Sequence, residues 1–114
     1  MSSVAIIGLG NVGTHLAKAF RQKSFRVLVW NRNQNEAKVF SLHNDCEHIE
    51  SLQEIPSDIQ LILLCVSDNA IPLIAKQLVN CTSVVAHCSG SVSMNVLQGI
   101  CEQYGVIYPL QSFR

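Results

Sequence analysis

The chain has 114 residues and a formal net charge of zero. This length suits a single domain with its own apolar core, whereas the neutral charge excludes the basic surface that nucleic acid or an anionic membrane would require. The longest apolar run, over residues 59–66 and interrupted by Gln60, is far shorter than a membrane span. We expect no signal peptide, because glycines and a polar helical pattern follow the first apolar segment at once, and we therefore expect a cytoplasmic protein.

The five cysteines are odd in number, and no two have C-x-x-C spacing. Both features favour reduced thiols over disulfides or a metal site. Only 14% of the residues are charged and 48% are hydrophobic, which is a low charge content for a small domain. We therefore expect another domain or subunit to cover one apolar face.

The first predicted elements are a strand, a glycine-rich turn and a helix. An apolar β-branched run stops at Gly8, and Gly10 and Gly13 follow as a helical pattern begins. In this G-x-G-x-x-G spacing the first glycine permits a sharp turn, the second lets a diphosphate approach the backbone, and the third lets the helix pack closely on the strand. The first helical residues, Asn11 and Val12, would direct free backbone N–H groups toward the phosphates. The segment predicts a dinucleotide-binding site.

Helical and strand patterns alternate along the rest of the chain. The sequence predicts helices over residues 11–22, 35–43, 70–79 and 94–103, a helical turn with a capping box over 51–54, and strands over 4–8, 26–30, 48–50, 61–66, 83–87 and 106–108. Ser67, Asp68 and Asn69 are the candidate N-caps of the third helix. The alternation predicts an α/β fold, a doubly wound parallel sheet between two helical layers with strand order 3-2-1-4-5-6. A ligand would lie across the carboxyl ends of the strands.

The residues after the second predicted strand indicate which nucleotide is bound. A carboxylate at this position binds the ribose 2′-hydroxyl in NAD-specific proteins, but this chain has Asn31 followed by Arg32. Asparagine does not repel a 2′-phosphate, and the Arg32 guanidinium could pair with that phosphate and stack on the adenine. The alternative is a turn asparagine beside a solvated arginine. We predict NADP(H) as the cofactor.

The nicotinamide end of the ligand should lie after the fourth and fifth strands. Small side chains at Cys65, Val66 and Ser67 would let backbone groups approach the cofactor. His87 and Ser89 are weak candidates for binding or proton transfer, because histidine titrates near neutrality. The alternative is that His87 only ends a strand. A dyad with Cys88 is not expected, since adjacent strand side chains point to opposite faces.

Five segments, over residues 8–13, 30–32, 65–68, 87–91 and 108–113, carry a resemblance to a known family. The chain resembles the N-terminal Rossmann-like domain of oxidoreductases whose C-terminal helical part is the domain of unknown function 2520. More distantly it is similar to pyrroline-5-carboxylate reductase and to the 6-phosphogluconate and 3-hydroxyisobutyrate dehydrogenases. The resemblance implies an NADP-dependent oxidoreductase of small molecules, with nucleotide contacts at Gly8, Gly10, Gly13, Asn31, Arg32 and Ser67.

In the dehydrogenase relatives the C-terminal helical domain, often dimeric, contributes much of the substrate pocket and usually a catalytic lysine. The resemblance therefore implies that residues 1–114 are the N-terminal domain of a longer, homodimeric protein. The whole protein would transfer a hydride between nicotinamide and an unidentified small metabolite, and this part alone would be inactive. Two other classes bind nucleotides through a similar turn: regulatory nucleotide-sensing domains and methyltransferases that use S-adenosylmethionine. Both usually place an acidic residue where Asn31 stands.

Overall fold

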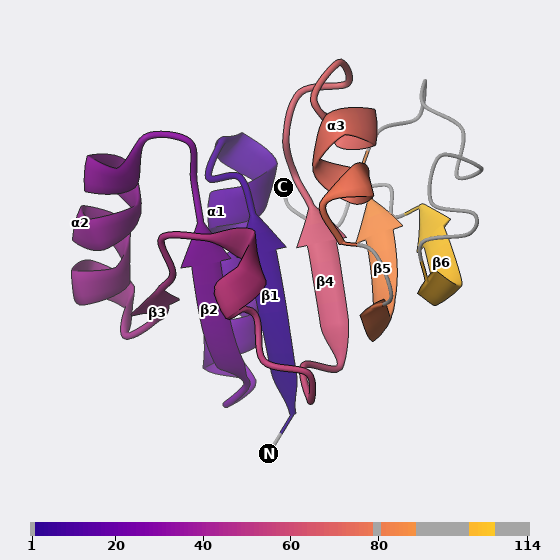
Figure 1. The fold of residues 1–114 in the computed structure, drawn as a ribbon. Helices are drawn as coiled ribbons and strands as arrows, with labels where there is room; N and C mark the ends of the chain where they lie inside the picture. The colour runs from indigo at the N-terminus through magenta and orange to yellow at the C-terminus, as the bar shows by residue number, and fades with distance from the viewer. Residues whose placement is uncertain (1, 79–80, 89–100, 107–114) are drawn as a thin grey trace.

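The computed structural model describes residues 2–78, 81–88 and 101–106. Strands and helices alternate in these residues (Figure 1). The strands are β1 (Ser3–Ile7), β2 (Arg26–Trp30), β3 (Glu47–His48), β4 (Leu61–Leu64), β5 (Cys81–His87) and β6 (Cys101–Val106); the α-helices are α1 (Asn11–Gln22), α2 (Gln34–Asn44) and α3 (Ile71–Lys76), and η1 (Leu52–Glu54) is a 3₁₀ turn. The element types and order along residues 2–78 agree with the sequence pattern.

The sheet is parallel and has the strand order β3-β2-β1-β4-β5-β6. This confirms the predicted doubly wound topology. In the pairing register, Ile7 of β1 stands opposite Trp30 of β2 and Leu64 of β4, and Leu64 stands opposite His87 of β5. These four residues form one row, so the loops that follow them start at a common edge of the sheet.

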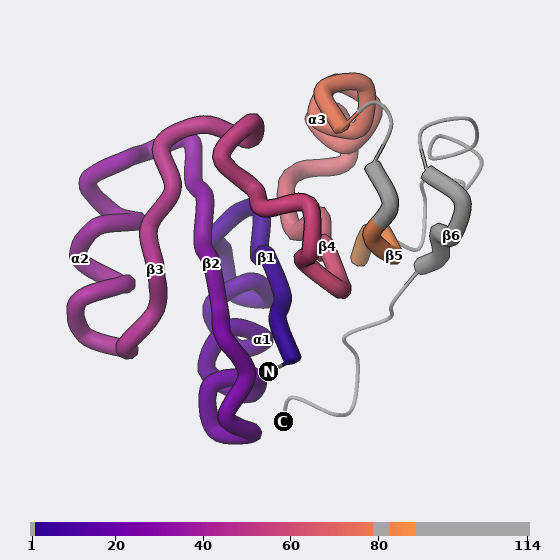
Figure 2. Tube along the Cα trace, turned by 60° about the horizontal axis from the view of Figure 1, so that its bottom comes forward, coloured from indigo at the N-terminus to yellow at the C-terminus, as the bar shows by residue number. Residues whose placement is uncertain are grey.

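Helices cover both faces of the sheet. On one face, Ala5 and Ile7 of β1 pack in a buried cluster with Leu52 of η1 and with residues of α3. On the other, Val4 and Ile6 pack with Leu16 and Ala17 of α1. Figure 2 shows α1 and α3 on opposite sides of the strands. Because both faces are covered, all five residues of β1 are buried, which explains why its sequence is apolar throughout.

Two local predictions were wrong. The N-cap of α3 is Ala70, without a side-chain cap, because a backbone turn from Ser67 to Ala70 ends one residue before the helix. The helix predicted over 94–103 does not extend into residues 101–103, which belong to β6, and the last strand begins before residue 106. Residues 101–106 form a strand because they pair with β5, and such long-range pairing overrides a local helical pattern. Residues 94–100, 107 and 108 lie outside the described part.

An exposed ion pair joins β2 to the edge strand β3. Arg26 Nε donates to Glu47 Oε2 at 2.6 Å, and its Nη2 donates to Oε1 at 3.0 Å. This hydrogen bonding, with the attraction of the guanidinium, lowers the pKa of Glu47. The pair reinforces a strand of only two residues. No helix among the described residues is long and apolar enough to cross a membrane.

We expect Glu47→Gln to lower the free energy of unfolding slightly at neutral pH and not at all in acid. A carboxyl whose pKa is lowered by folding stabilises the protein above its unfolded pKa, and this contribution is lost as the pH falls through the folded pKa. The loss should be small because both side chains are exposed. Urea unfolding of wild type and variant at about pH 7 and about pH 3 measures it. A difference that persists at the lower pH would contradict the assignment.

Candidate functional site

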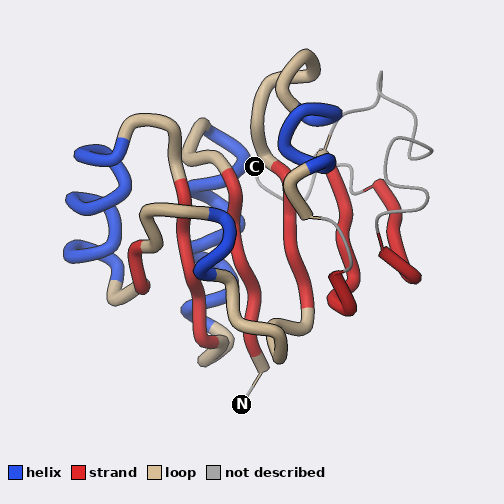
Figure 3. Tube along the Cα trace, in the orientation of Figure 1, coloured by secondary structure: helices blue, strands red, loops and turns tan. Residues whose placement is uncertain are grey.

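The loops that follow β1, β2 and β4 leave the same edge of the sheet (Figure 3). They contain the predicted glycine turn, the Asn31–Arg32 pair and the small residues that end at Ser67. The pairing register thus brings together three segments that are far apart in the sequence. At the carboxyl edge of a doubly wound sheet, this is where such folds bind their ligands.

The glycine turn is tightly packed where it leaves β1. Gly8 has a φ of +104°, and a Cβ there would lie 2.5 Å from the carbonyl oxygen of Cys65. A Cβ at Gly13 would overlap the carbonyl oxygen of Gly8. Residue 8 therefore needs a backbone conformation open to glycine, and residue 13 needs glycine so that α1 can approach the strand.

Gly10 has different surroundings, although it lies between these two glycines. A Cβ at this position would meet no atom within 4 Å. Gly10 is also the N-cap of α1, with no side-chain cap. The first N–H groups of a helix have no acceptor within the helix, and those of α1 begin at Asn11, beside this open space. The fold itself does not require glycine here, so the open space fits an incoming diphosphate.

Asn31 ties the loop after β2 to the glycine turn. Its Oδ1 accepts a hydrogen bond from the backbone N–H of Leu9 at 3.0 Å. Its Nδ2 donates to the carbonyl oxygen of Asn33 at 3.3 Å and to Glu36 Oε2 at 3.2 Å. A second tie runs from the N–H of Gly8 to the carbonyl oxygen of Trp30 at 2.7 Å. The side chain of Asn31 therefore positions both loops; a contact with the nucleotide stays a prediction.

A cavity of about 540 Å³ opens between these loops and α3, within the size range of small-molecule sites. Its walls are Gly8, Leu9, Gly10, Trp30, Asn31, Arg32, Cys65, Val66, Ser67, Ala70, Leu73, Ile74 and Gln77. Arg32 is the one charged side chain among these lining residues, and none of them is acidic. The cavity therefore combines apolar side chains, open space at Gly10 and a single guanidinium, a combination suited to an anionic nucleotide.

Most of the predicted site residues meet at this cavity. Asn11, Val12 and Gly13, in the first turn of α1, are not among its lining residues, so their contacts with the nucleotide stay predictions. His87 ends β5 and is fully buried, while Ser89 lies outside the described residues, so catalytic roles for both stay predictions. Cys88 packs on the α1 side of the sheet together with Ala86. Alternation along the strand therefore places the His87 ring on the opposite face, as expected from the sequence.

Sequence reasoning missed the wall that α3 provides. Leu73 lines the cavity although 63% of its surface is exposed, and Gln77 lies one turn further along. A large apolar side chain on the exposed side of a short helix was the available signal. The sequence predicts Trp30 as the last residue of a strand, and its side chain also lines the cavity. Its Nε1 donates to the carbonyl oxygen of Glu50 at 3.3 Å.

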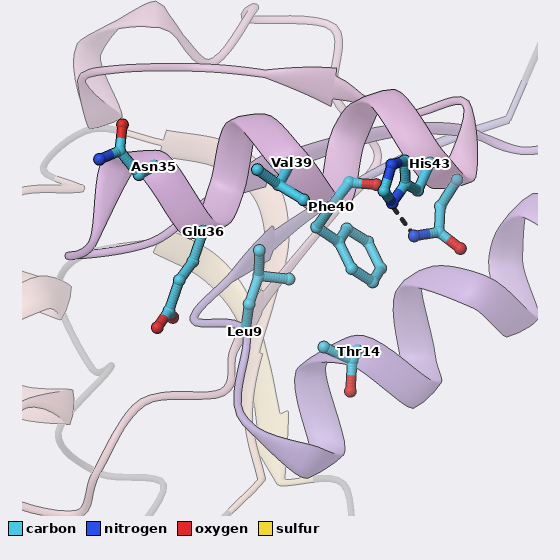
Figure 4. Close-up of a pocket in the computed structure, with 8 residues that line it drawn as sticks. Leu9, Thr14, Asn35, Glu36, Val39, Phe40 and His43 are labelled. Atoms are coloured by element: carbon cyan, nitrogen blue, oxygen red, sulfur yellow. Dashed lines mark hydrogen bonds between the residues drawn. The ribbon is translucent and has the colours of Figure 1, made fainter.

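A second cavity, of about 480 Å³, lies between the glycine turn, α1 and α2. Figure 4 shows Leu9 and Thr14 on one side, facing Val39 and Phe40 of α2 on the other. Glu36 is the one acidic side chain of its lining residues, and none of them is lysine or arginine. A negatively charged diphosphate would be repelled there, so the first cavity is the candidate nucleotide site.

The parallel topology, the glycine turn and the cavity define a nicotinamide-dinucleotide-binding domain of the Rossmann type. Residues 3–91 match the family described as the NAD binding domain of 6-phosphogluconate dehydrogenase, and the chain belongs to this family. It is the N-terminal, NAD(P)-binding type of domain found in dehydrogenases and reductases. Among curated proteins, none is similar enough in sequence to count as a match.

Solved structures share the fold. A proposed NADP oxidoreductase from Bacteroides fragilis is 32% identical, with a TM-score of 0.86 over 99% of this chain and 46% of its own. Prephenate dehydrogenase from A. aeolicus, solved with NAD⁺, is 19% identical (TM-score 0.72; 89% of this chain, 40% of its own). Pyrroline-5-carboxylate reductase from Streptococcus pyogenes is 16% identical (TM-score 0.74; 89% and 39%). The chain thus spans less than half the length of each.

Proposed function

We propose that the domain binds NADP(H) in preference to NAD(H). The observation that carries this proposal is the cavity wall, where Arg32 stands as the charged lining residue beside the end of β2 and no lining residue is acidic. A carboxylate at the end of β2 would select the free ribose 2′-hydroxyl of NAD. Arg32 instead offers a planar donor set to the additional phosphate of NADP.

The diphosphate would lie over Gly10, where a Cβ would meet no neighbouring atom, and would accept from the first N–H groups of α1. The adenine would lie beside Arg32 and the exposed Leu73, because Arg32, in the loop after β2, and Leu73, on α3, both line the cavity. The nicotinamide end would extend toward Cys65, Val66 and Ser67. These three residues follow β4, next to β5 in the sheet.

When bound, the nicotinamide ring would exchange a hydride with an unidentified small metabolite. Membership in a dehydrogenase family and the likeness to an NADP oxidoreductase support this part of the proposal. The residues of this chain would hold the cofactor at the cavity described above. Substrate binding by a C-terminal helical domain, and assembly into a homodimer through it, are further parts of the proposal that rest on the family resemblance.

Arg32→Ala tests the preference for NADPH. We expect wild type to bind NADPH more tightly than NADH, and the variant to lose about ten- to a hundredfold in NADPH affinity, since hydrogen bonds to charged groups contribute about 1.5–3 kcal/mol. Its NADH affinity should change little. Isothermal titration calorimetry with both nucleotides measures all four constants.

Lys23→Ala is the matched control. Lys23 is exposed at the far end of α1, away from the glycine turn, so this variant removes the same charge without touching the cavity. Its affinities for both nucleotides should equal those of wild type. Equal affinity of wild type for NADH and NADPH would contradict the proposed role of Arg32.

A further inference from the structure

Two cysteine thiols face each other beside the nucleotide cavity. Cys65 follows β4 and Cys88 follows β5, two strands that lie side by side in the sheet (Figure 1). Leu64 and His87 are paired in the register, so the two cysteines are the next residues along each strand. Their sulfur atoms are 3.6 Å apart. A disulfide requires about 2.05 Å between sulfurs, and neighbouring strands already hold the backbones at about 4.8 Å, within the range that disulfides span.

The two thiols are in contact with each other and are accessible to a small oxidant. The hydrogen bond between the two thiols, in which either sulfur can be the donor, lowers the pKa of Cys88, and the same contact, with burial, raises the pKa of Cys65. The thiolate is the form that attacks an oxidant. Both side chains are only partly buried, so a small oxidant can reach them. Either sulfur can attack the oxidant, and its neighbour at 3.6 Å resolves the product.

Cys65 is also part of the support for the glycine turn. Its N–H donates to the carbonyl oxygen of Ile7 at 2.7 Å, and its carbonyl oxygen would lie 2.5 Å from a Cβ at Gly8. Its own Cβ would lie 3.4 Å from a Cβ at Gly13. Since there is so little space around the turn, a displacement of Cys65 toward Cys88 would disturb the backbone that faces the diphosphate.

We propose that Cys65 and Cys88 are a reversible dithiol–disulfide pair whose oxidation weakens nucleotide binding; the second half of this proposal rests on the proposed function. The oxidant is a hydroperoxide. One of the two sulfurs, as the thiolate, attacks the O–O bond and becomes a sulfenic acid; the other oxygen leaves with the proton that this thiol had released, as water or as an alcohol. The second sulfur then displaces the sulfenic oxygen, which leaves as water with the proton of the second thiol, and the S–S bond forms. Two electrons pass from the thiols to the peroxide, and a thiol reductant reverses the change.

Mapping of disulfides tests the first half. The folded chain is treated with hydrogen peroxide, its remaining thiols are alkylated, and it is digested without reduction for mass spectrometry. We expect a peptide linking Cys65 to Cys88 in wild type and in the control Cys46→Ser, which removes another half-buried cysteine of the same face. The link should be absent in Cys88→Ser and should disappear after dithiothreitol.

The same samples test the second half through NADPH affinity. Peroxide should weaken binding about tenfold in wild type and in Cys46→Ser but leave the affinity of Cys88→Ser where it was before treatment. By reciprocity, saturating nucleotide should make the pair harder to oxidise, with a shift of about 30 mV for each tenfold difference in affinity. A redox titration with and without NADP⁺ measures that shift.

If both thiols of wild type are still alkylated after peroxide treatment, the proposed disulfide is contradicted. This measurement uses wild type alone, so it does not depend on whether a variant folds. A disulfide between Cys81 and Cys101 instead of Cys65 and Cys88 would also contradict the proposal. Cys81 and Cys101 are likewise partners in the strand register. A Cys65–Cys88 link with unchanged NADPH affinity would overturn the coupling. Failure of the reduced protein to bind NADPH would instead count against the proposed function, because the disulfide map is obtained without nucleotide.

Discussion

Gly13→Ala should unfold at a much lower urea concentration than wild type. The added Cβ would overlap the carbonyl oxygen of Gly8, and both groups belong to backbone that cannot rotate away. Relief would require α1 to move off β1, although Leu16 and Ala17 of this helix are buried against the sheet. Overpacking costs about 1–3 kcal/mol and occasionally more, and we expect about 3 kcal/mol here because the contact would be with backbone, which cannot yield as a flexible side chain can. For a domain of this size the melting temperature should fall by roughly 10 °C or more.

Gly10→Ala is the matched control for this measurement. It makes the same chemical change three residues earlier, at a position where a Cβ would meet no atom within 4 Å and where φ is −76°. The free energy of unfolding of Gly10→Ala should stay within about 1 kcal/mol of wild type. Equal destabilisation by the two substitutions would show that α1 does not approach β1 as described.

Gly10→Ala should nevertheless lose most of its nucleotide binding. The added methyl group would project into the open space that the proposed function assigns to the diphosphate, and it would keep phosphate oxygens from the first N–H groups of α1. Loss of one or two charge-assisted hydrogen bonds corresponds to a decrease in affinity of about ten- to a hundredfold. Titration calorimetry with NADPH measures it.

This substitution should weaken NADPH and NADH alike, because both carry the diphosphate. Arg32→Ala should affect NADPH alone. The two variants therefore separate the diphosphate contact from the 2′-phosphate contact. Normal NADPH binding by a folded Gly10→Ala variant would place the nucleotide elsewhere and would count against the whole proposed site.

Much of the fold could be predicted because its signals are local. The apolar run before Gly8 and the helical spacing from Asn11 to Gln22 predict β1 and α1, and the structure places α1 over those residues. The capping box at Ser51 and Glu54 is also formed as predicted, with both of its hydrogen bonds. Each of these features depends on residues within a few positions of one another, so the sequence records it directly.

The remaining features depend on contacts between distant residues. The bond from Leu9 to Asn31 joins positions 22 residues apart, so the sequence could not show that the side chain of Asn31 is engaged by the protein itself. The wall formed by Leu73 depends on how α3 lies against the loops of β1 and β2. The contact of Cys65 with Cys88 depends on strand register. Composition and spacing carry no information on these distances.

The ties from Gly8 to Trp30 and from Leu9 to Asn31 have a consequence for the kinetics of association. They fix two of the three loops before any nucleotide arrives, so the conformational entropy of ordering them is lost during folding and not at binding. Encounter should then be limited by diffusion and orientation, with no slow rearrangement of the backbone afterwards.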